Sequence, residues 1–183
     1  MAAVIGLDDN VVEESIQTLM NNSGEKIFIA NYNGPGQLVL SGSKQGIKEA
    51  CRLFKSMGAK RAVVLPIEGA FHTPLMNEVE LKYRKSIQDI SFKTPIIPIC
   101  QCADSKINFE SEFVKLNLMS HMTSSVNWTK MVNRLVNFGV TEFIEIGTDD
   151  TLQKIVRRMY PDLKVSSILQ IETYKGLIRD YSL

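Results

Sequence analysis

The first 66 residues alternate between two hydrophobic periods, one typical of strands and one typical of helices. Four short apolar runs predict strands, at Ala2–Leu7, Ile27–Tyr32, Gln37–Ser41 and Lys60–Pro66. Apolar residues at helical spacing predict two helices, one carrying Val12, Ile16, Leu19 and Met20, the other carrying Ile47, Ala50, Cys51 and Phe54. The βαββαβ order predicts a ferredoxin-like subdomain, in which helices cover one face of an antiparallel sheet.

Cap and turn residues separate these elements. Asn10 and Glu13 have the spacing of a capping box, which predicts the start of the first helix. Ser43 predicts an N-cap for the second helix, and Gly58 predicts its end. Residues 33–36 read Asn-Gly-Pro-Gly and predict a turn between the two middle strands.

Strands and helices continue to alternate after residue 66, and strands separated by helices favour a parallel sheet. Thr73 and Pro74 predict the first helix start of this half. The predicted elements are a helix with Leu75, Val79, Tyr83 and Ile87 on one face, a strand at Ile96–Cys100, a helical stretch after the polar connection Asp104–Asn108, a helix with Trp128, Met131, Val132, Leu135 and Val136, a strand at Val140–Gly147, a helix with Leu152, Ile155 and Val156, and a strand at Lys164–Leu169. We therefore divide the chain into a small subdomain, 1–66, and an α/β part, 67–183.

The amino-acid composition excludes several classes of protein. The 183 residues are 44% hydrophobic and 22% charged, which is ordinary for a globular chain. The net charge of +1 disfavours nucleic-acid binding. No apolar run approaches the roughly 20 residues that cross a bilayer, so we expect no membrane span. The N-terminus lacks the basic region of a signal peptide, and three cysteines are too few for a disulfide framework, so we expect a reducing, cytoplasmic location.

His72 is the first candidate for chemistry, because it follows a predicted strand and directly precedes a predicted helix. Ligands gather at the carboxyl ends of strands in open α/β sheets, and an imidazole acts as a general base near neutral pH. On isolated sequence grounds, a role in capping the turn at Thr73 and Pro74 is favoured over catalysis. His121 has polar neighbours and no acidic residue beside it, which favours a solvated surface histidine.

No nucleophile or metal site accompanies His72 in the sequence. No serine stands in a Gly-x-Ser-x-Gly elbow, and neither Cys100 nor Cys102 is placed detectably against a base. Only two histidines are present, so zinc ligands with the usual spacings cannot be assembled and we expect no metal. The acidic pair Asp149 and Asp150 is better explained as a helix cap than as a cation site.

Two polar segments are candidates for contact with a phosphate or a pantetheine chain. Residues 31–37, with the amides of Asn31 and Asn33, form a turn rich in donors, although a plain hairpin needs no ligand. Lys60 and Arg61 form a basic pair, although two charges are usually a solvated strand end.

Six segments together resemble the C-terminal portion of the malonyl-CoA:acyl-carrier-protein transacylases, which are related to the acyltransferase domains of fatty-acid and polyketide synthases. The resemblance covers residues 1 to about 160, in order and at suitable intervals. The matching segments are 1–7, 31–37, 58–62, 69–76, 126–128 and 142–147.

The resemblance implies a fold and a set of roles. The fold is a hydrolase-like α/β body with an inserted ferredoxin-like subdomain, so residues 67–183 are expected to form the C-terminal part of that body. His72 matches the histidine that assists a serine in ping-pong malonyl transfer from coenzyme A to the carrier protein's phosphopantetheine thiol, with no metal and no cofactor beyond the coenzyme A thioester that is the substrate. Phe71 resembles the malonyl-selecting form of the motif. Position 121 resembles one whose backbone carbonyl orients the imidazole, so His121 is expected to act through its backbone.

The sequence also departs from the family. The Gly-His-Ser-x-Gly nucleophile, the Gly-Gln-Gly-Ser-Gln oxyanion loop and the arginine that holds the malonyl carboxylate precede the segment matching residues 1–7 in the family, and none occurs here. We therefore expect the C-terminal half of a malonyltransferase, inactive alone and dependent on a complementary N-terminal half. Without the strands of that half, an apolar edge and face are expected to be exposed.

Two alternatives remain open at this point. One is a non-catalytic module in which residues 31–37, Lys60 and Arg61 bind carrier protein or coenzyme A. The other is a product without activity, which would fold poorly. In addition, residues 147–152 carry two carboxylates where the family has Gly-Pro-Gly-Lys-Val-Leu, which changes the surface offered to an anionic ligand.

Overall fold

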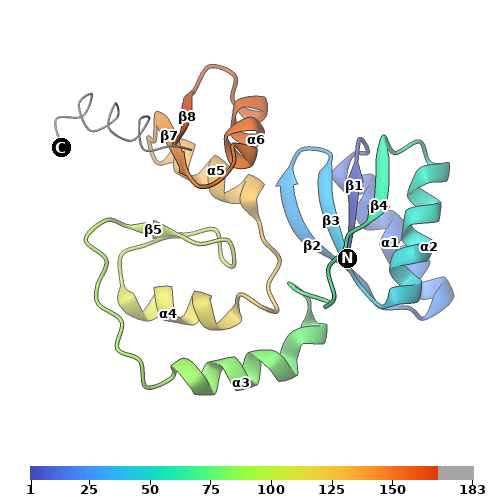
Figure 1. Ribbon diagram of the computed structural model, residues 1–183, viewed down its shortest axis with the longest axis horizontal. Coiled ribbons are helices and arrows are strands. Elements are labelled where there is room, and N and C mark those ends of the chain that lie inside the picture. Colours follow the sequence, from blue (N-terminus) through green and yellow to red (C-terminus); the bar gives the residue numbers. More distant parts are fainter. Residues whose placement is uncertain (169–183) are drawn as a thin grey trace. The chain divides into compact units, whose positions relative to one another are not determined.

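Four antiparallel strands open the computed structural model, which describes residues 1–168. The strands are β1 (Ala2–Ile5), β2 (Ile27–Gly34), β3 (Gln37–Gly42) and β4 (Arg61–Val64). Their order is β2-β3-β1-β4, and α1 (Asp9–Ser23) and α2 (Lys44–Ser56) lie together on one face of the sheet (Figure 1). This arrangement confirms the predicted ferredoxin-like subdomain.

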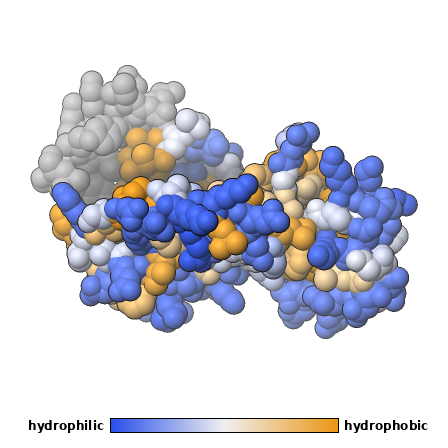
Figure 2. Space-filling model, turned by 90° about the horizontal axis from the view of Figure 1, so that it is seen from below, coloured by the Kyte–Doolittle hydropathy of each residue, from blue (hydrophilic) through white to orange (hydrophobic). Residues whose placement is uncertain are grey.

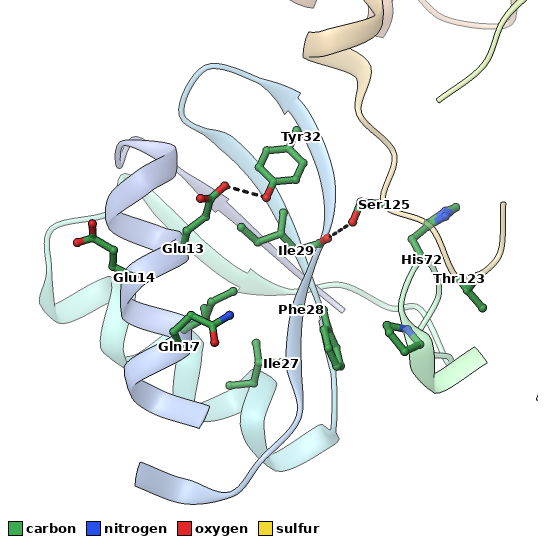
Figure 3. A pocket seen from close by; sticks show the side chains of 12 residues that line it. Glu13, Glu14, Gln17, Ile27, Phe28, Ile29, Tyr32, His72, Thr123 and Ser125 are labelled. Atoms are coloured by element: carbon green, nitrogen blue, oxygen red, sulfur yellow. Dashed lines mark hydrogen bonds between the residues drawn. The ribbon is translucent and has the colours of Figure 1, made fainter. Parts of the chain in front are cut away.

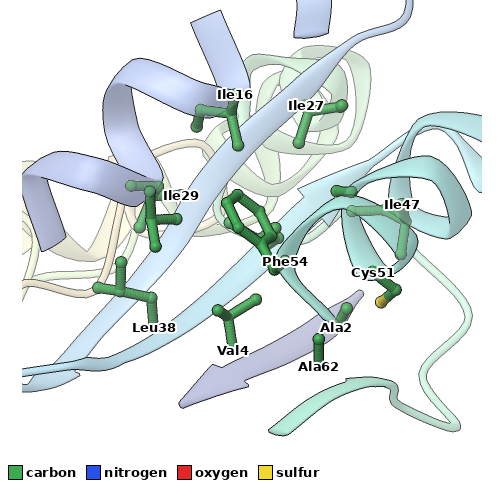
Figure 4. Close-up of a cluster of buried hydrophobic side chains, with 13 residues drawn as sticks. Ala2, Val4, Ile16, Ile27, Ile29, Leu38, Ile47, Cys51, Phe54 and Ala62 are labelled. Carbon is green, nitrogen blue, oxygen red and sulfur yellow. The ribbon is translucent and has the colours of Figure 1, made fainter. Parts of the chain in front are cut away.

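The core of this subdomain fills the space between the helices and the sheet (Figure 4). Val12 and Ile16 of α1 and Phe54 of α2 are buried, and they pack with the inward residues of the strands, such as Val4 and Leu40. Burying a side chain the size of Phe54 contributes about 1.5–3 kcal/mol. The predicted helical faces are therefore the ones that the core uses.

One predicted cap is confirmed and one is wrong. The Ser43 hydroxyl accepts a hydrogen bond from the Gly46 backbone N–H at 3.1 Å, as an N-cap does. The capping box at Asn10 does not form, because α1 starts earlier, with Asp8 at its cap position and no side-chain cap bond. The Glu13 carboxylate instead accepts the hydroxyl of Tyr32 at 2.8 Å.

Helices and short strands follow the small sheet. They are the 3₁₀ turn η1 (Pro74–Met76), α3 (Asn77–Ile87), β5 (Ile99–Cys100), β6 (Ile107–Asn108), α4 (Ser111–Ser120) and α5 (Trp128–Asn137). The predicted strand at Ile96–Cys100 is wrong in its first three residues, because Pro98 has no N–H for a ladder. Part of the predicted polar connection, Ile107–Asn108, pairs antiparallel with that shortened strand, so β5 does not join the predicted parallel sheet.

The chain separates into two compact units, Met1–Arg134 and a second that begins at Leu135. The boundary that the sequence predicts, between residues 66 and 67, lies inside the first unit and stays a prediction. In the second unit, β7 (Glu142–Ile146) and β8 (Lys164–Ile168) pair in parallel, as the alternation with helices predicts. The predicted last residue of β8, Leu169, lies outside the described residues.

Helix α6 (Thr151–Met159) joins the two parallel strands, and two carboxylates satisfy its N-terminus. Asp149 Oδ1 accepts the Thr151 N–H at 2.9 Å. Glu145, on β7, accepts the N–H groups of Leu152 and Gln153 at 3.1 and 2.7 Å. The acidic turn therefore serves as a cap, as predicted, although Asp150 makes no side-chain cap bond and Glu145 was not foreseen.

Large apolar side chains are exposed at several places. Figure 2 shows apolar residues, in orange, among hydrophilic ones on the face that it draws. In the first unit Ile96 is 102% and Ile97 is 77% exposed, and Val64 on the edge strand β4 is 57% exposed. The predicted exposure of apolar surface is therefore present. Within residues 1–168, no helix has the length and apolar content that a bilayer crossing requires.

Candidate active site

The chain after α4 is joined to the edge of the small sheet. Val126 pairs with β2 in parallel fashion, its N–H donating to the Ala30 carbonyl at 2.8 Å and its carbonyl accepting the Tyr32 N–H at 2.9 Å. The Ser125 hydroxyl donates to the carbonyl of Ile29 at 2.7 Å. These bonds bring the end of α4 to β2, which is an edge strand of the sheet.

His72 has a backbone conformation that is uncommon for a residue other than glycine. Its φ is +61°, in the left-handed region, and strained residues of this kind cluster at functional sites. Its backbone N–H donates to the carbonyl of Met122 at 2.9 Å. The hydroxyl that caps the following turn belongs to Thr73 and accepts the Leu75 N–H at 3.2 Å, so no capping bond by the His72 side chain explains its position.

A second hydrogen bond determines which ring nitrogen of neutral His72 carries the proton. Nδ1 lies 3.0 Å from the carbonyl oxygen of His121. Because a carbonyl oxygen only accepts, Nδ1 carries the proton in this bond. In the neutral imidazole Nε2 is then the nitrogen with a free lone pair, which is the form that a general base needs.

His121 itself is half-buried rather than solvated. Its ring centroid lies 5.1 Å from that of His72, with the two planes tilted by 56°. Burial lowers the pKa of His121, and the neighbouring charge of a protonated His72 lowers that pKa further. The sequence expectation of a surface side chain is therefore wrong, whereas the backbone contact is the one that the resemblance implies.

A cavity of about 620 Å³ lies between α1 and the segment around His72 (Figure 3). Glu13, Glu14 and Gln17 line its α1 side, and Thr123 and Ser125 lie on the side of His72. The His72 ring is turned away from α1, towards the segment that carries Thr123 and Ser125. No lysine or arginine is among the described residues that line the cavity, so a cation for a malonyl carboxylate is not provided there.

The other predicted binding residues lie apart from this cavity. Tyr32 lines it, but its neighbours Asn31 and Asn33 do not. Lys60 and Arg61 are exposed, and Arg61 lies on β4, at the sheet edge opposite to β2. The structure thus brings together His72 and the backbone of His121, and places the basic pair elsewhere.

Phe71 packs against the backbone of its own loop. It is half-buried, and a β-carbon built on Gly69 would lie 2.5 Å from Cε2 of the Phe71 ring. Gly69 has a φ of +149°, and its missing side chain is what leaves room for the ring. Phe71 is not among the residues that line the cavity, so its role in substrate selection stays a prediction.

The thiols are not suited to replace a serine. Burial raises the pKa of Cys100 to about 11 and also raises the pKa of Cys102 and of Cys51. The thiolate is the nucleophilic form of cysteine, and these groups remain protonated at neutral pH. Among the described residues, no group of three His, Cys, Asp or Glu side chains is placed to hold a metal ion.

Curated relatives match nearly the whole chain. A malonyl CoA-acyl carrier protein transacylase from Staphylococcus aureus is 35% identical over 177 residues, and one from Bacillus subtilis is 31% identical over 179 residues. The matches cover 96% and 98% of this chain but 57% and 56% of those proteins. Over nearly its whole length the chain is therefore similar to part of the malonyl CoA-acyl carrier protein transacylases. It spans little more than half the length of these transacylases, in agreement with the predicted match to their C-terminal portion.

Solved transacylase structures share the fold. An acyl-carrier-protein S-malonyltransferase from Bartonella henselae superposes with a TM-score of 0.92 at 28% identity, over 100% of this chain and 57% of that one. A malonyl-transacylase solved in complex with a type II polyketide synthase acyl-carrier protein gives a TM-score of 0.91 at 26% identity, over 98% of this chain and 57% of that one. No protein-family model matches the chain. These transacylase structures confirm the predicted mixed α/β fold class.

Proposed function

We propose that this chain supplies the general-base histidine of a malonyl-CoA:acyl-carrier-protein S-malonyltransferase. The observation that supports the proposal is the Nδ1 hydrogen bond of His72 to the His121 carbonyl, because it leaves Nε2 as the proton acceptor. The hydrogen bond from the His72 backbone N–H to the Met122 carbonyl supports the same role, because it fixes the backbone that carries the ring. The positive φ of His72 also supports it, because strained residues cluster at functional sites.

The proposed reaction has two half-reactions. A serine hydroxyl gives its proton to His72 Nε2 and attacks the malonyl thioester, the carbon–sulfur bond breaks, and the imidazolium returns the proton to the departing coenzyme A thiolate. In the second half, the phosphopantetheine thiol gives its proton to Nε2 and attacks the malonyl ester, and the serine oxygen recovers the proton. His72 thus acts as base and then acid in each half, and no metal or redox group takes part.

The proposal assigns the serine, the oxyanion donors and a carboxylate-binding arginine to a complementary N-terminal segment. Two features of the structure support this assignment. The cavity beside His72 is lined by Glu13 and Glu14 without a basic residue among its described lining, so an anionic acyl group needs a cation from elsewhere. Apolar side chains such as Ile96 and Ile97 are exposed in the same unit, as expected of a surface that another segment covers.

The proposed acceptor is an acyl carrier protein. Support comes from the solved malonyl-transacylase, 26% identical to this chain, which is in complex with its carrier protein. The exposed pair Lys60 and Arg61 has the charge to meet an acidic partner or the phosphates of coenzyme A.

Reconstitution tests the catalytic proposal. The chain is mixed with the N-terminal segment of the Staphylococcus aureus relative that it does not match, and malonyl transfer from coenzyme A to a carrier protein is followed by mass spectrometry. We expect no transfer by the chain alone and transfer by the mixture. His72→Ala is expected to lower the rate by about 10²–10⁴-fold, the usual contribution of a general base. His121→Gln keeps the backbone carbonyl and serves as the matched control.

The outcome also separates catalysis from binding alone. Transfer that is unchanged by His72→Ala would contradict the base assignment. Carrier-protein binding that is lost in Lys60→Glu, with no transfer in any mixture, would instead support the non-catalytic binding module.

A further inference from the structure

A buried carboxylate lies on the helix that follows His72. Glu80, in α3, is 9% exposed, and burial of an ionised carboxylate costs free energy unless the charge is paired. Its Oε1 accepts a hydrogen bond from Arg84 Nε at 2.6 Å, one helical turn away. Its Oε2 accepts the hydroxyl of Thr123. Both carboxylate oxygens therefore have a partner.

Thr123 directly follows the two residues that hold His72. The His121 carbonyl accepts the His72 Nδ1–H, and the Met122 carbonyl accepts the His72 backbone N–H. The Thr123 to Glu80 bond therefore closes a ring of contacts, from His72 through α3 to Glu80, then to Thr123 and back to His72. This ring ties the segment 121–123 to α3, which begins at Asn77, five residues after His72.

We propose that Glu80, acting through Thr123, is a positioning residue for the His72 imidazole and holds it in the Nδ1–H tautomer. The inference rests on the proposed function, in which Nε2 of His72 is the base. The proposed role involves no contact of Glu80 or Thr123 with the substrate. Their task is to fix the His121 carbonyl at hydrogen-bond distance from Nδ1.

The contacts of Glu80 favour this role over a purely stabilising one. The Glu80–Arg84 ion pair lies within α3 and the Arg84 side chain is 38% exposed, so the pair itself adds little to the free energy of unfolding. The contact that joins two segments is the hydrogen bond between Thr123 and Glu80, which fixes the segment 121–123, and with it the His121 carbonyl, against α3. Because hydrogen bonds weaken steeply when their angle and distance change, a small shift of 121–123 is enough to release Nδ1.

Nuclear magnetic resonance of ¹⁵N-labelled imidazoles measures the tautomer directly. The chain has two histidines, so a His121→Gln background leaves His72 as the sole imidazole while keeping the backbone carbonyl. In that background we expect the neutral ring to be mainly Nδ1–H. Thr123→Val removes the hydroxyl at nearly constant volume and is expected at least to halve the Nδ1–H population. Thr123→Ser, which keeps a hydroxyl, is expected to restore it.

Variants of the carboxylate complete the experiment. Glu80→Ala is expected to lower the Nδ1–H population as Thr123→Val does. It separates the contact with Glu80 from the 3.2 Å contact of the Thr123 hydroxyl with the Ser120 carbonyl, which Thr123→Val also removes. Glu80→Gln is expected to be milder, because an amide oxygen still accepts the Thr123 hydroxyl. Glu78→Ala, an exposed glutamate on the same helix, is the matched control and should leave the tautomer unchanged. If Glu80→Ala does not fold, the comparison of Thr123→Val with Thr123→Ser decides the question.

Two results would overturn the inference. One is an Nδ1–H population that Thr123→Val leaves unchanged, and the other is a loss that Thr123→Ser or Glu78→Ala produces equally. The measurement needs no substrate and no second segment. A failure of malonyl transfer in the reconstituted mixture would therefore count against the proposed base role and would leave the positioning result standing.

Discussion

Single residues at the candidate site combine ordinary chemistry with unusual placement. His72 is an ordinary imidazole until its backbone takes a left-handed φ and its Nδ1 meets the carbonyl of a residue far along the chain. The sequence identified His72 and the position of His121, because the resemblance supplied them. It did not identify Glu80 or Thr123, although the Glu80 and Arg84 spacing is a recognisable pair signal on a helix.

The half-buried His121 predicts a dependence of stability on pH. Its pKa lies below the ordinary value of 6.5 in the folded chain, because burial and His72 both disfavour the charged form. As pH falls below 6.5, the unfolded chain takes up this proton first, so the stability conferred by neutral His121 is present above that pH and declines below it. We expect the thermal midpoint of unfolding to decrease as the pH is lowered from about 7 to about 5.5, and to decrease less in His121→Gln. Equal slopes in the two proteins would contradict this account.

The elements show where local signals suffice. Ser43 caps α2 and the apolar face of α2 is the buried one, because cap and periodicity are both written within one helix. The start of α1 and the extent of β5 were predicted less well. Asn10 does not cap α1 because the helix already begins at Asp9, and Glu13 bonds Tyr32 of β2 instead. Pro98 shortens a run whose hydrophobicity favours a strand.

A close backbone approach between β2 and β3 provides a test at this scale. A β-carbon on Gly42 would lie 2.1 Å from the Lys26 carbonyl oxygen, and backbone cannot move aside as a flexible side chain does. We expect Gly42→Ala to destabilise the subdomain by about 1–3 kcal/mol, measured by denaturant unfolding. Lys44→Ala, at a neighbouring exposed position, is the control and should change stability by less than about 0.5 kcal/mol. A Gly42→Ala protein as stable as this control would show that the two strands separate at little cost.

Across the molecule, the exposed apolar residues connect the fold to its proposed use. Ile96 and Ile97 contribute almost nothing to the core of the described structure, being 102% and 77% exposed. The chain also spans 57% of its Staphylococcus aureus relative. A surface that is costly to leave in water is explained when another segment covers it.

If another segment covers Ile96 and Ile97, changing them should affect assembly but not the folding of this chain. Changing Ile96 and Ile97 together to Thr should leave the free energy of unfolding within about 0.5 kcal/mol, because no buried contact is lost. The same change should weaken binding to the N-terminal segment of the relative, as measured by calorimetry. Gln88→Ala is the exposed control. Binding that equals that of the unaltered chain would place the covered surface elsewhere.

The sequence by itself determined most of the elements, the ferredoxin-like order and the resemblance to the transacylases, because helical and strand periods, caps and motif segments are local patterns. It also determined that His72 was worth examining. Only the tertiary structure showed that Thr123 and Glu80 lie behind the Nδ1 hydrogen bond of this ring, since the segment with His121 is 49 residues from His72 and Glu80 is on a different helix. Hydrogen bonds between distant segments depend on packing, and packing is a property of the folded chain.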